Sequence, residues 1–178
     1  MNSTASNACG APISTKRRRT LADLLLVAVG KIGRGPEADL FARYNARLRP
    51  AFSVREIAEG SGAGAEIKRR EAAAILAAVP GPAIAVALDL GGATPDSEAF
   101  SASLTRWRDS GKALCFIIGG AEGLDAAVIA RADHILALGS LTWPHMLVRV
   151  MLAEQVFRAQ SIASGHPYHR AGRPGVGA

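Results

Sequence analysis

Several features that commonly assign a chain to a class are scarce or missing in these 178 residues. There are two cysteines, Cys9 and Cys115, and no Cys/His spacing that resembles a zinc site. A chain of this length can bury a sufficient core without disulfides or metal, so we expect one domain in a reducing cytoplasm, with no bound metal. No serine–histidine–acid order or paired-carboxylate signature is present, which leaves the hydrolase classes without support.

Long apolar runs are also missing. Arg149 and Glu154 interrupt the longest apolar segment, so we expect no membrane span. The apolar run Leu21–Gly30 follows Lys16–Arg19, as in a signal peptide, but Asp23 interrupts it and no small-residue cleavage site follows it. We therefore interpret this run as a buried strand.

Acidic residues are absent from the first 20 positions, which contain the basic cluster Lys16–Arg19. These four charges account for most of the formal net charge of +6, so the rest of the chain carries an excess of only +2. Because residues 1–22 show no apolar period, we expect a disordered basic extension there. Its charge suits a polyanion such as RNA, and a solvated arm without a partner is equally consistent.

From residue 23 on, apolar strands alternate with helices. Strands are predicted at Leu24–Val29, Phe52–Ala58, Ala83–Leu88, Leu114–Ile118 and His134–Leu138, and helices from Pro36 to Pro50, from about Gly64 to Ala78, and at Glu98–Ser110, Leu124–Arg131 and His145–Ala163. This order is typical of an α/β fold with a mostly parallel sheet and helices on both faces. Ligands of such sheets bind beyond the carboxyl ends of the strands, so the loops after Leu88, Ile118 and Leu138 are the first candidates for a site.

The loop Gly119–Gly123 joins a predicted strand to a helix. Its glycines let backbone N–H groups approach a ligand, although a tight structural turn explains them equally well. The spacing is G-G-x-x-G rather than G-x-G-x-x-G, and no Gly-Lys-Ser/Thr follows. The loop therefore argues against NAD(P) and ATP as ligands.

A second strand-to-helix loop runs from Leu138 to Trp143. The side chains of Leu138, Leu141 and Trp143 can wall an apolar slot for a flat ring, and polar groups nearby can bond its edge. Packing of Trp143 beneath the next helix is the simpler alternative. That helix has an apolar stripe wider than one core face needs, which suits either core packing or burial against a second copy. Its charged residues Arg149, Glu154 and Arg158 are expected to be solvated or paired across an interface.

The tail gathers His166, Tyr168, His169 and Arg170 within five residues. Arginine and histidine bind phosphate, and tyrosine stacks on a base, so the tail suits a nucleotide. The alternative is a frayed terminus of chance composition.

Taken together, these segments resemble the bacterial 23S ribosomal RNA pseudouridine-N3 methyltransferases of the SPOUT class. The resemblance rests on LLLVAVGK near the start, Leu88-Asp89, IGGAEGL, LGSLTWPHMLVRVMLAEQVFRAQSI and HPYHR. It covers most of the chain after residue 23. The basic extension before Asp23 and the glycine-rich segment 171–178 depart from the family pattern. We thus expect one methyltransferase domain over 23–170 and a flexible tail over 171–178.

The resemblance implies more than the residues show by themselves. It implies a C-terminal trefoil knot, a homodimer, and S-adenosylmethionine bound in the knot loops, with the target base reached from the partner subunit. Matching positions select as cofactor-binding residues Leu88, Gly119, Leu138, Gly139, Ser140, Leu141, Thr142 and Trp143. The implied activity is methylation of N3 of a pseudouridine in 23S rRNA, free or in assembled ribosomes.

In that activity Tyr168, His169 and Arg170 are expected to clamp the target base. The ring nitrogen carries a proton at neutral pH, and His169 is the candidate to accept it, while Arg170 favours the developing negative charge. A stacking or phosphate-binding role for these three residues fits equally well.

Three other functions stay open from the sequence. The chain can be a non-catalytic RNA-binding module, which needs the basic extension over residues 1–22 but not the two strand-to-helix loops. It can also be a different small-molecule transferase on an unknotted sheet. Finally, it can be a methyltransferase of the same class that acts on tRNA or on another rRNA position.

Overall fold

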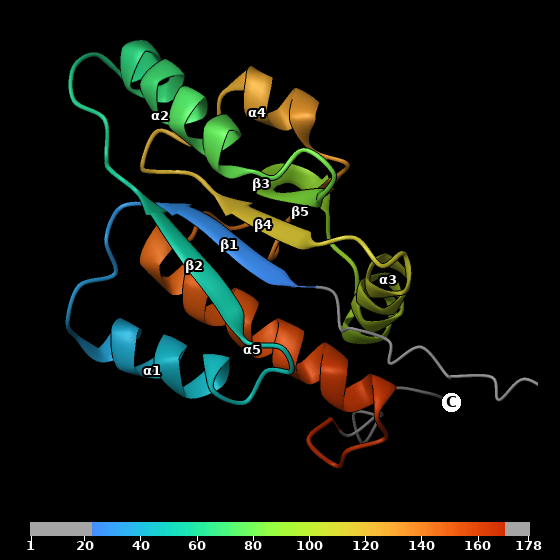
Figure 1. Ribbon diagram of the computed structural model, residues 1–178. Helices are drawn as coiled ribbons and strands as arrows, with labels where there is room; N and C mark the ends of the chain where they lie inside the picture. Colours follow the sequence, from blue (N-terminus) through green and yellow to red (C-terminus); the bar gives the residue numbers. More distant parts are fainter. Residues whose placement is uncertain (1–22, 170–178) are drawn as a thin grey trace, which may run out of the picture.

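The computed structural model describes residues 23–169 (Figure 1). The predicted extension 1–22, Arg170 and the predicted tail 171–178 lie outside the described residues. Within 23–169 the chain forms β1 (Leu24–Val29), α1 (Pro36–Asn45), β2 (Phe52–Ile57), α2 (Gly64–Ala78), β3 (Ile84–Ala93), α3 (Ser97–Asp109), β4 (Leu114–Ile118), α4 (Ala126–Arg131), β5 (His134–Leu136) and α5 (His145–Ala163).

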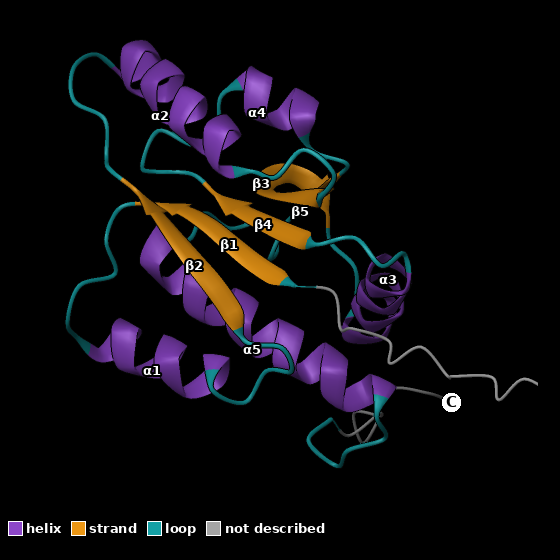
Figure 2. Cartoon of the chain, in the orientation of Figure 1, coloured by secondary structure: helices purple, strands orange, loops and turns teal. Residues whose placement is uncertain are grey.

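The strands form one sheet in the order β2-β1-β4-β3-β5, and every neighbouring pair is parallel. Helices α1, α3 and α5 cover one face and α2 and α4 the other (Figures 1 and 2). The predicted parallel α/β fold is therefore confirmed. The carboxyl ends of all the strands lie at one edge of the sheet.

Side chains along the central strands point alternately to the two faces of the sheet, and each face forms its own hydrophobic core. On β1, Leu24, Leu26 and Ala28 face α1, α3 and α5, whereas Val27 and Val29 face α2 and α4. All five of these side chains are buried, which confirms that the apolar run after Asp23 is a core strand.

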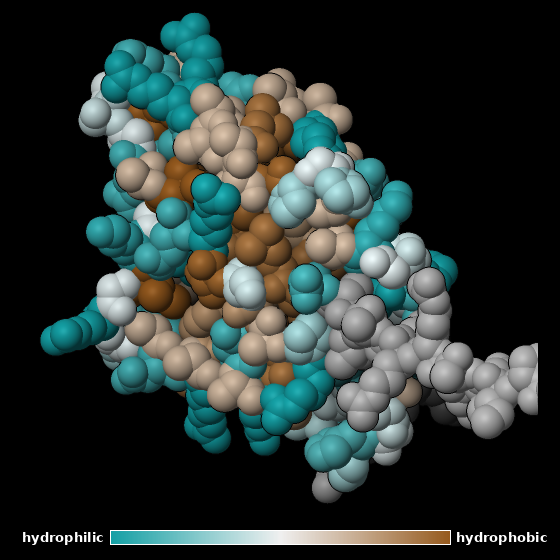
Figure 3. Space-filling model, viewed as in Figure 1, coloured by the Kyte–Doolittle hydropathy of each residue, from teal (hydrophilic) through white to brown (hydrophobic). Residues whose placement is uncertain are grey.

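Strand β2 departs from the prediction of uniformly apolar, buried strands. Only Phe52 and Ile57 at its two ends are buried, while its four middle residues are exposed. The physical reason is its place at the sheet edge, where it pairs with β1 alone. Figure 3 shows apolar surface at the middle of this side of the molecule, with hydrophilic side chains around it.

The ends of most elements fall close to the predicted positions. Helix α1 begins at Pro36, although it ends at Asn45, before Pro50. Asp96 caps α3, because its Oδ1 accepts a hydrogen bond from the backbone N–H of Ala99 at 2.8 Å. Gly111, at φ 75°, follows this helix.

Strand β3 runs beyond its predicted end at Leu88, to Ala93. Leu136 of β5 lies opposite both Leu88 and Ala93, so residues 89–92 bulge out of the ladder between them. The backbone then returns to β5, where the N–H of Ala137 donates to the Ala93 carbonyl at 2.8 Å. A Cβ at Gly92 would lie 2.7 Å from backbone atoms of Ile135 and Leu136, so two distant segments touch here backbone to backbone. The trefoil knot that the resemblance implies stays a prediction.

Helix α5 is tied to the end of β1 by Arg149, which is only 1% exposed. Its Nη2 donates to the carbonyls of Val29 at 2.7 Å and Gly30 at 2.6 Å, and its Nη1 pairs with Glu56 Oε1 at 2.9 Å. The prediction of a solvated or intersubunit Arg149 is therefore wrong. Its guanidinium satisfies carbonyls that the end of a parallel strand leaves open.

Candidate functional site

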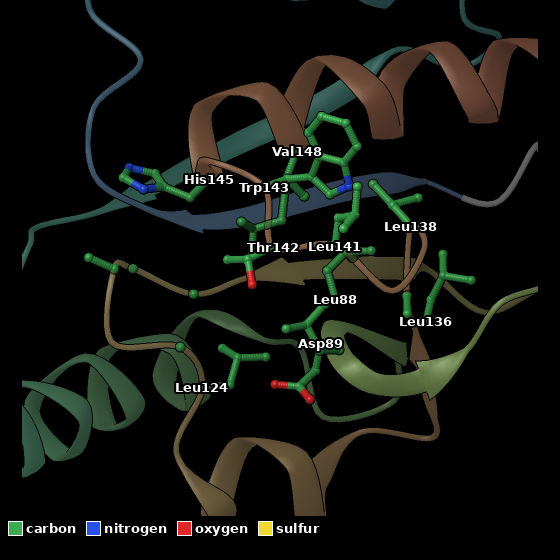
Figure 4. Close-up of a pocket in the computed structure, with 17 residues that line it drawn as sticks. Leu88, Asp89, Leu124, Leu136, Leu138, Leu141, Thr142, Trp143, His145 and Val148 are labelled. Atoms are coloured by element: carbon green, nitrogen blue, oxygen red, sulfur yellow. The ribbon is translucent and has the colours of Figure 1, made fainter.

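A pocket lies at the carboxyl ends of β3, β4 and β5 (Figure 4). The segments after Leu88, Ile118 and Leu138, which the sequence predicted as candidate ligand loops, all contribute to it. The second half of β3 contributes Asp89 and Leu90 to the lining. The lining residues that follow β4 are Gly119, Gly120, Ala121, Gly123 and Leu124, and those that follow β5 are Ala137, Leu138, Leu141, Thr142, Trp143, His145 and Val148.

One wall of the pocket is the glycine loop after β4. The N–H of Gly123 donates to the carbonyl of Gly120 at 3.0 Å, which closes a turn, and Gly123 has φ +79°. A Cβ at Gly119 would lie 3.0 Å from the backbone carbon of Gly123. The loop is thus a tight turn that also presents bare backbone to the pocket. The interpretation as a structural turn is confirmed, and the approach of its N–H groups to a ligand stays a prediction.

The facing wall is the loop from β5 to α5. Figure 4 shows Leu138, Leu141 and Thr142 projecting toward Leu88, and the ring of Trp143 beside Val148 at the start of α5. Of the eight positions selected for a cofactor, the pocket is lined by Leu88, Gly119, Leu138, Leu141, Thr142 and Trp143. Gly139 and Ser140 belong to the same loop but do not line the pocket.

Two polar residues in the pocket were not selected from the sequence. Asp89 is the only carboxylate among the described residues that line it, and its Oδ1 accepts a hydrogen bond from the N–H of Gly91 at 2.9 Å. His145 also lines the pocket, and its Nε2 is buried without a hydrogen-bond partner. The position of a carboxylate directly after the predicted strand Ala83–Leu88 is the sequence signal that points to Asp89.

This arrangement fits one kind of ligand. Leucine, valine and tryptophan side chains suit a flat apolar ring, and the glycine backbone offers hydrogen bonds to its edge. Among the described residues that line the pocket, the one acidic or basic side chain is a carboxylate, so the pocket favours a ligand that also carries positive charge. Burial raises the pKa of the Cys115 thiol to about 12, so that thiol is not a nucleophile at neutral pH.

The tail packs on the far part of α5. The Tyr168 hydroxyl donates to Glu154 Oε1 at 2.9 Å, and its ring lies 4.6 Å from the Phe157 ring. The Arg158 guanidinium lies 5.0 Å from the Tyr168 ring and pairs with Glu154 on the same helix. These two charges were expected to be solvated or paired across an interface, but they pair with each other within one chain. His169 lies at the end of the described chain, with Nδ1 buried and without a hydrogen-bond partner.

Tyr168 keeps its proton in this setting. Burial raises the pKa of its hydroxyl well above the ordinary value, and hydrogen bonds with Tyr44 and Glu154 and the negative charge of Glu154 raise it further. A neutral phenol at physiological pH donates a hydrogen bond and stacks, but it does not accept a proton as a base. Of the two described members of the predicted clamp, only His169 can serve as a base.

The pocket and the tail lie at opposite ends of α5. The helix has 19 residues, so at about 1.5 Å per residue its ends are about 27 Å apart. His145 and Val148 at its start line the pocket, whereas Tyr168 contacts Glu154 and Phe157 and follows its end. None of the described tail residues lines this pocket, so within one chain the described members of the predicted clamp are not part of it.

Exposed apolar side chains surround the pocket. Leu141 is 67% exposed, Leu90 56%, Trp143 40% and Leu147 37%. Large apolar groups gathered on one surface are typical of a binding or association site. None of the described helices has the length and apolarity needed to cross a membrane, and no three potential metal ligands cluster among the described residues.

Comparison with known proteins agrees with this geometry. Residues 23–169 match a family model described as predicted SPOUT methyltransferase. The chain is similar to the ribosomal RNA large subunit methyltransferase H of Gluconacetobacter diazotrophicus, at 59% identity over 149 residues, 84% of this chain and 98% of the relative. It is also similar to the protein of the same name from Acidiphilium cryptum, at 56% identity over 153 residues, 86% of this chain and 97% of the relative.

Among solved structures, the chain is similar to the SpoU methyltransferase AviRb from Streptomyces viridochromogenes in complex with the cofactor AdoMet. The TM-score is 0.45 at 14% identity, over 80% of this chain and 59% of that one.

Proposed function

This chain belongs to the SPOUT methyltransferase family, and from that premise we propose that it methylates ribosomal RNA of the large subunit, with S-adenosylmethionine as methyl donor. The observation that carries the proposal is the pocket at the ends of β3, β4 and β5, in a chain that matches the whole length of large-subunit rRNA methyltransferases. Following the resemblance, we assign the reaction to N3 of a pseudouridine in 23S rRNA.

The pocket suits S-adenosylmethionine on chemical grounds. Leu138, Leu141 and Trp143 would hold the adenine ring, and the backbone at Gly119 would bond its polar edge. Asp89 and the Thr142 hydroxyl project from facing walls in Figure 4 and would hold the polar and cationic parts. When bound, the cofactor supplies an electrophilic methyl group; the protein supplies position and exclusion of water, together worth up to ~7–11 kcal/mol of the barrier.

Asp89→Asn tests the electrostatic part of this assignment. Asparagine keeps the oxygen that accepts from Gly91 N–H but removes the charge, so we expect S-adenosylmethionine to bind about fivefold to tenfold more weakly, by calorimetry. Glu98→Gln, an exposed charge on α3, is the control and should leave the affinity unchanged. An Asp89→Asn variant with wild-type affinity would show that the carboxylate does not face the ligand.

The active site is composite in this proposal and forms between two copies of the chain. None of the described tail residues lines the pocket of its own chain, and Tyr168 packs on Glu154, about 9 Å along α5 from the pocket-lining Val148, so we assign the tail to the pocket of a neighbour. The exposed Leu90, Leu141, Trp143 and Leu147 supply the apolar surface that such a homodimer would bury. Sedimentation of the full chain should give the mass of a dimer.

At the composite site the tail residues have separate roles. Tyr168, held by Glu154 and Phe157, stacks on the target base. His169 accepts the proton from the ring nitrogen, and Arg170, by the family pattern, favours the negative charge that develops on the ring. Because the receiving nitrogen is otherwise protonated, removal of that proton and alignment with the methyl group are the two tasks of this chain.

The decisive experiment is methyl transfer itself. Purified chain with radiolabelled S-adenosylmethionine should label 23S rRNA in ribosomes from cells that lack the gene, and mass spectrometry should place the methyl group on a pseudouridine. Labelling of tRNA alone, or of another rRNA nucleoside, would show that the chain is a methyltransferase of this family with a different target. Binding of rRNA without any transfer would favour the non-catalytic module. The ribosomal substrate places the protein in the cytoplasm.

A further inference from the structure

A second cavity lies at the end of the molecule that carries the tail. It is lined by Arg47 and Arg49, which follow α1, by Arg108 at the end of α3, and by Phe157, Gln160 and His166 near the end of α5. No carboxylate of the described chain lines it. Cationic side chains from three separate elements therefore converge on one concave surface.

Neutral groups hold two of these guanidiniums in place. Nη1 of Arg49 donates to the carbonyls of Ala46 at 2.9 Å and Leu48 at 2.7 Å. The Arg47 guanidinium lies 4.6 Å from the centroid of the Phe157 ring. Carbonyls and an aromatic face orient a guanidinium without cancelling its charge, so the cavity keeps a positive potential. None of the ion pairs formed among the described residues involves Arg47 or Arg49.

The cavity also contains an unused hydrogen-bond donor. Gln160 Oε1 accepts a hydrogen bond from the backbone N–H of Arg49 at 3.0 Å, which fixes the orientation of the side-chain amide. The Nε2 of Gln160 is then buried without a hydrogen-bond partner. A buried donor without an acceptor is costly, so this position favours a ligand that brings an acceptor oxygen.

Positive charge, an unpaired amide donor on a lining residue and no lining carboxylate among the described residues together describe a receptor for an anion. The planar guanidinium matches the paired oxygens of a phosphate. His166 lines the cavity and stands two residues before Tyr168, so the cavity adjoins the part of the tail that would hold the target base. We propose that the cavity formed by Arg47, Arg49, Arg108 and His166 binds a phosphate of the rRNA backbone beside the target nucleotide. This inference rests on the proposed function and adds a docking site to it.

Salt dependence of RNA binding tests the proposal. Arg47→Gln removes one charge and leaves the carbonyl contacts of Arg49 intact. We expect the Arg47→Gln variant to bind a 23S rRNA fragment that contains the unmodified target nucleotide about tenfold more weakly than the wild-type chain at 50 mM salt. The slope of log K against log salt should fall by about 0.7 to 0.9, the value for one lost phosphate contact. Arg47→Lys should keep the slope, because it keeps the charge.

Arg69→Gln is the matched control, since Arg69 is an exposed arginine on α2, on the opposite face of the sheet. Wild-type slope and affinity in Arg47→Gln would overturn the proposal. An equal loss in Arg69→Gln would also overturn it, because diffuse surface charge would then explain the binding. If the wild-type chain fails to transfer methyl groups, the proposed function fails; methyl transfer with an unaltered slope in Arg47→Gln refutes only the phosphate site.

A measurement on the wild-type chain avoids any effect of substitution on folding. Phenylglyoxal modifies exposed arginines, and peptide mass spectrometry gives the rate at each position. The rRNA fragment should slow modification of Arg47 and Arg49 and leave Arg69 unchanged. Equal rates with and without RNA at Arg47 and Arg49 would contradict the proposal.

Discussion

Replacing Gly92 with alanine is expected to destabilise the folded chain by about 3 kcal/mol or more, the upper range for overpacking a closed site. The new methyl group would lie 2.7 Å from backbone carbon and nitrogen atoms of Ile135 and Leu136. A side chain could rotate away, but the backbone of β5 is held by its hydrogen bonds to β3. Relief therefore requires separation of the 89–93 bulge from β5. Thermal and urea unfolding of the purified variants measures the effect.

Gly91→Ala is the matched control. A Cβ at Gly91 would meet only the Asp89 carboxylate, at 3.3 Å, and that side chain can move. We expect a loss of stability below about 1 kcal/mol for this variant. Equal stability of Gly91→Ala and Gly92→Ala would show that the bulge and β5 are not in close contact. Because Asp89 and Leu136 both line the pocket, Gly92→Ala should also weaken binding of S-adenosylmethionine.

Replacing His169 with alanine should lower kcat by about 10²-fold or more, the usual contribution of a general base, and leave the affinity for S-adenosylmethionine unchanged. Its imidazole has a buried Nδ1 without a hydrogen-bond partner and does not line the pocket of its own chain. Steady-state methyl transfer to the rRNA measures kcat, and calorimetric titration of S-adenosylmethionine measures the affinity.

His134→Ala separates loss of a base from general damage. His134 stacks on Trp107 at 4.7 Å, outside the residues that line either cavity, so this variant should retain activity. Equal loss of turnover and cofactor affinity in His169→Ala would mean that the tail builds the cofactor site instead. Mixing His169→Ala subunits with Asp89→Asn subunits should restore part of the activity, because one composite site of the mixed dimer is then intact.

The fold could be predicted largely from the periodicity of apolar residues. Leu24–Val29, Leu114–Ile118 and His145–Ala163 are correct to the residue, because continuous burial and firm breakers set their ends. The extension of β3 to Ala93 could not be predicted, since it depends on pairing with the distant Leu136. The edge position of β2 likewise follows from strand order, which no local pattern encodes.

The candidate site could be predicted in outline but not in its polar details. The rule that ligands bind beyond the carboxyl ends of parallel strands predicted the loops that line the pocket. Six of the eight positions selected for the cofactor line that one pocket. Asp89 could not be selected from the sequence, because a single acidic residue after a predicted strand is common. Arg149 was misjudged because its partners Val29, Gly30 and Glu56 lie about 90 to 120 residues away in the chain.

Helix α5 holds pocket residues at its first turn and the tail after its last, and Arg149 fixes it to β1. An α-helix advances by roughly 100° per residue, so one inserted or deleted residue would swing the tail to another side of the helix axis. Point substitutions on the outer surface of α5 leave that angular setting untouched. The number of residues in this helix is consequently part of the catalytic apparatus, as much as any side chain that it bears.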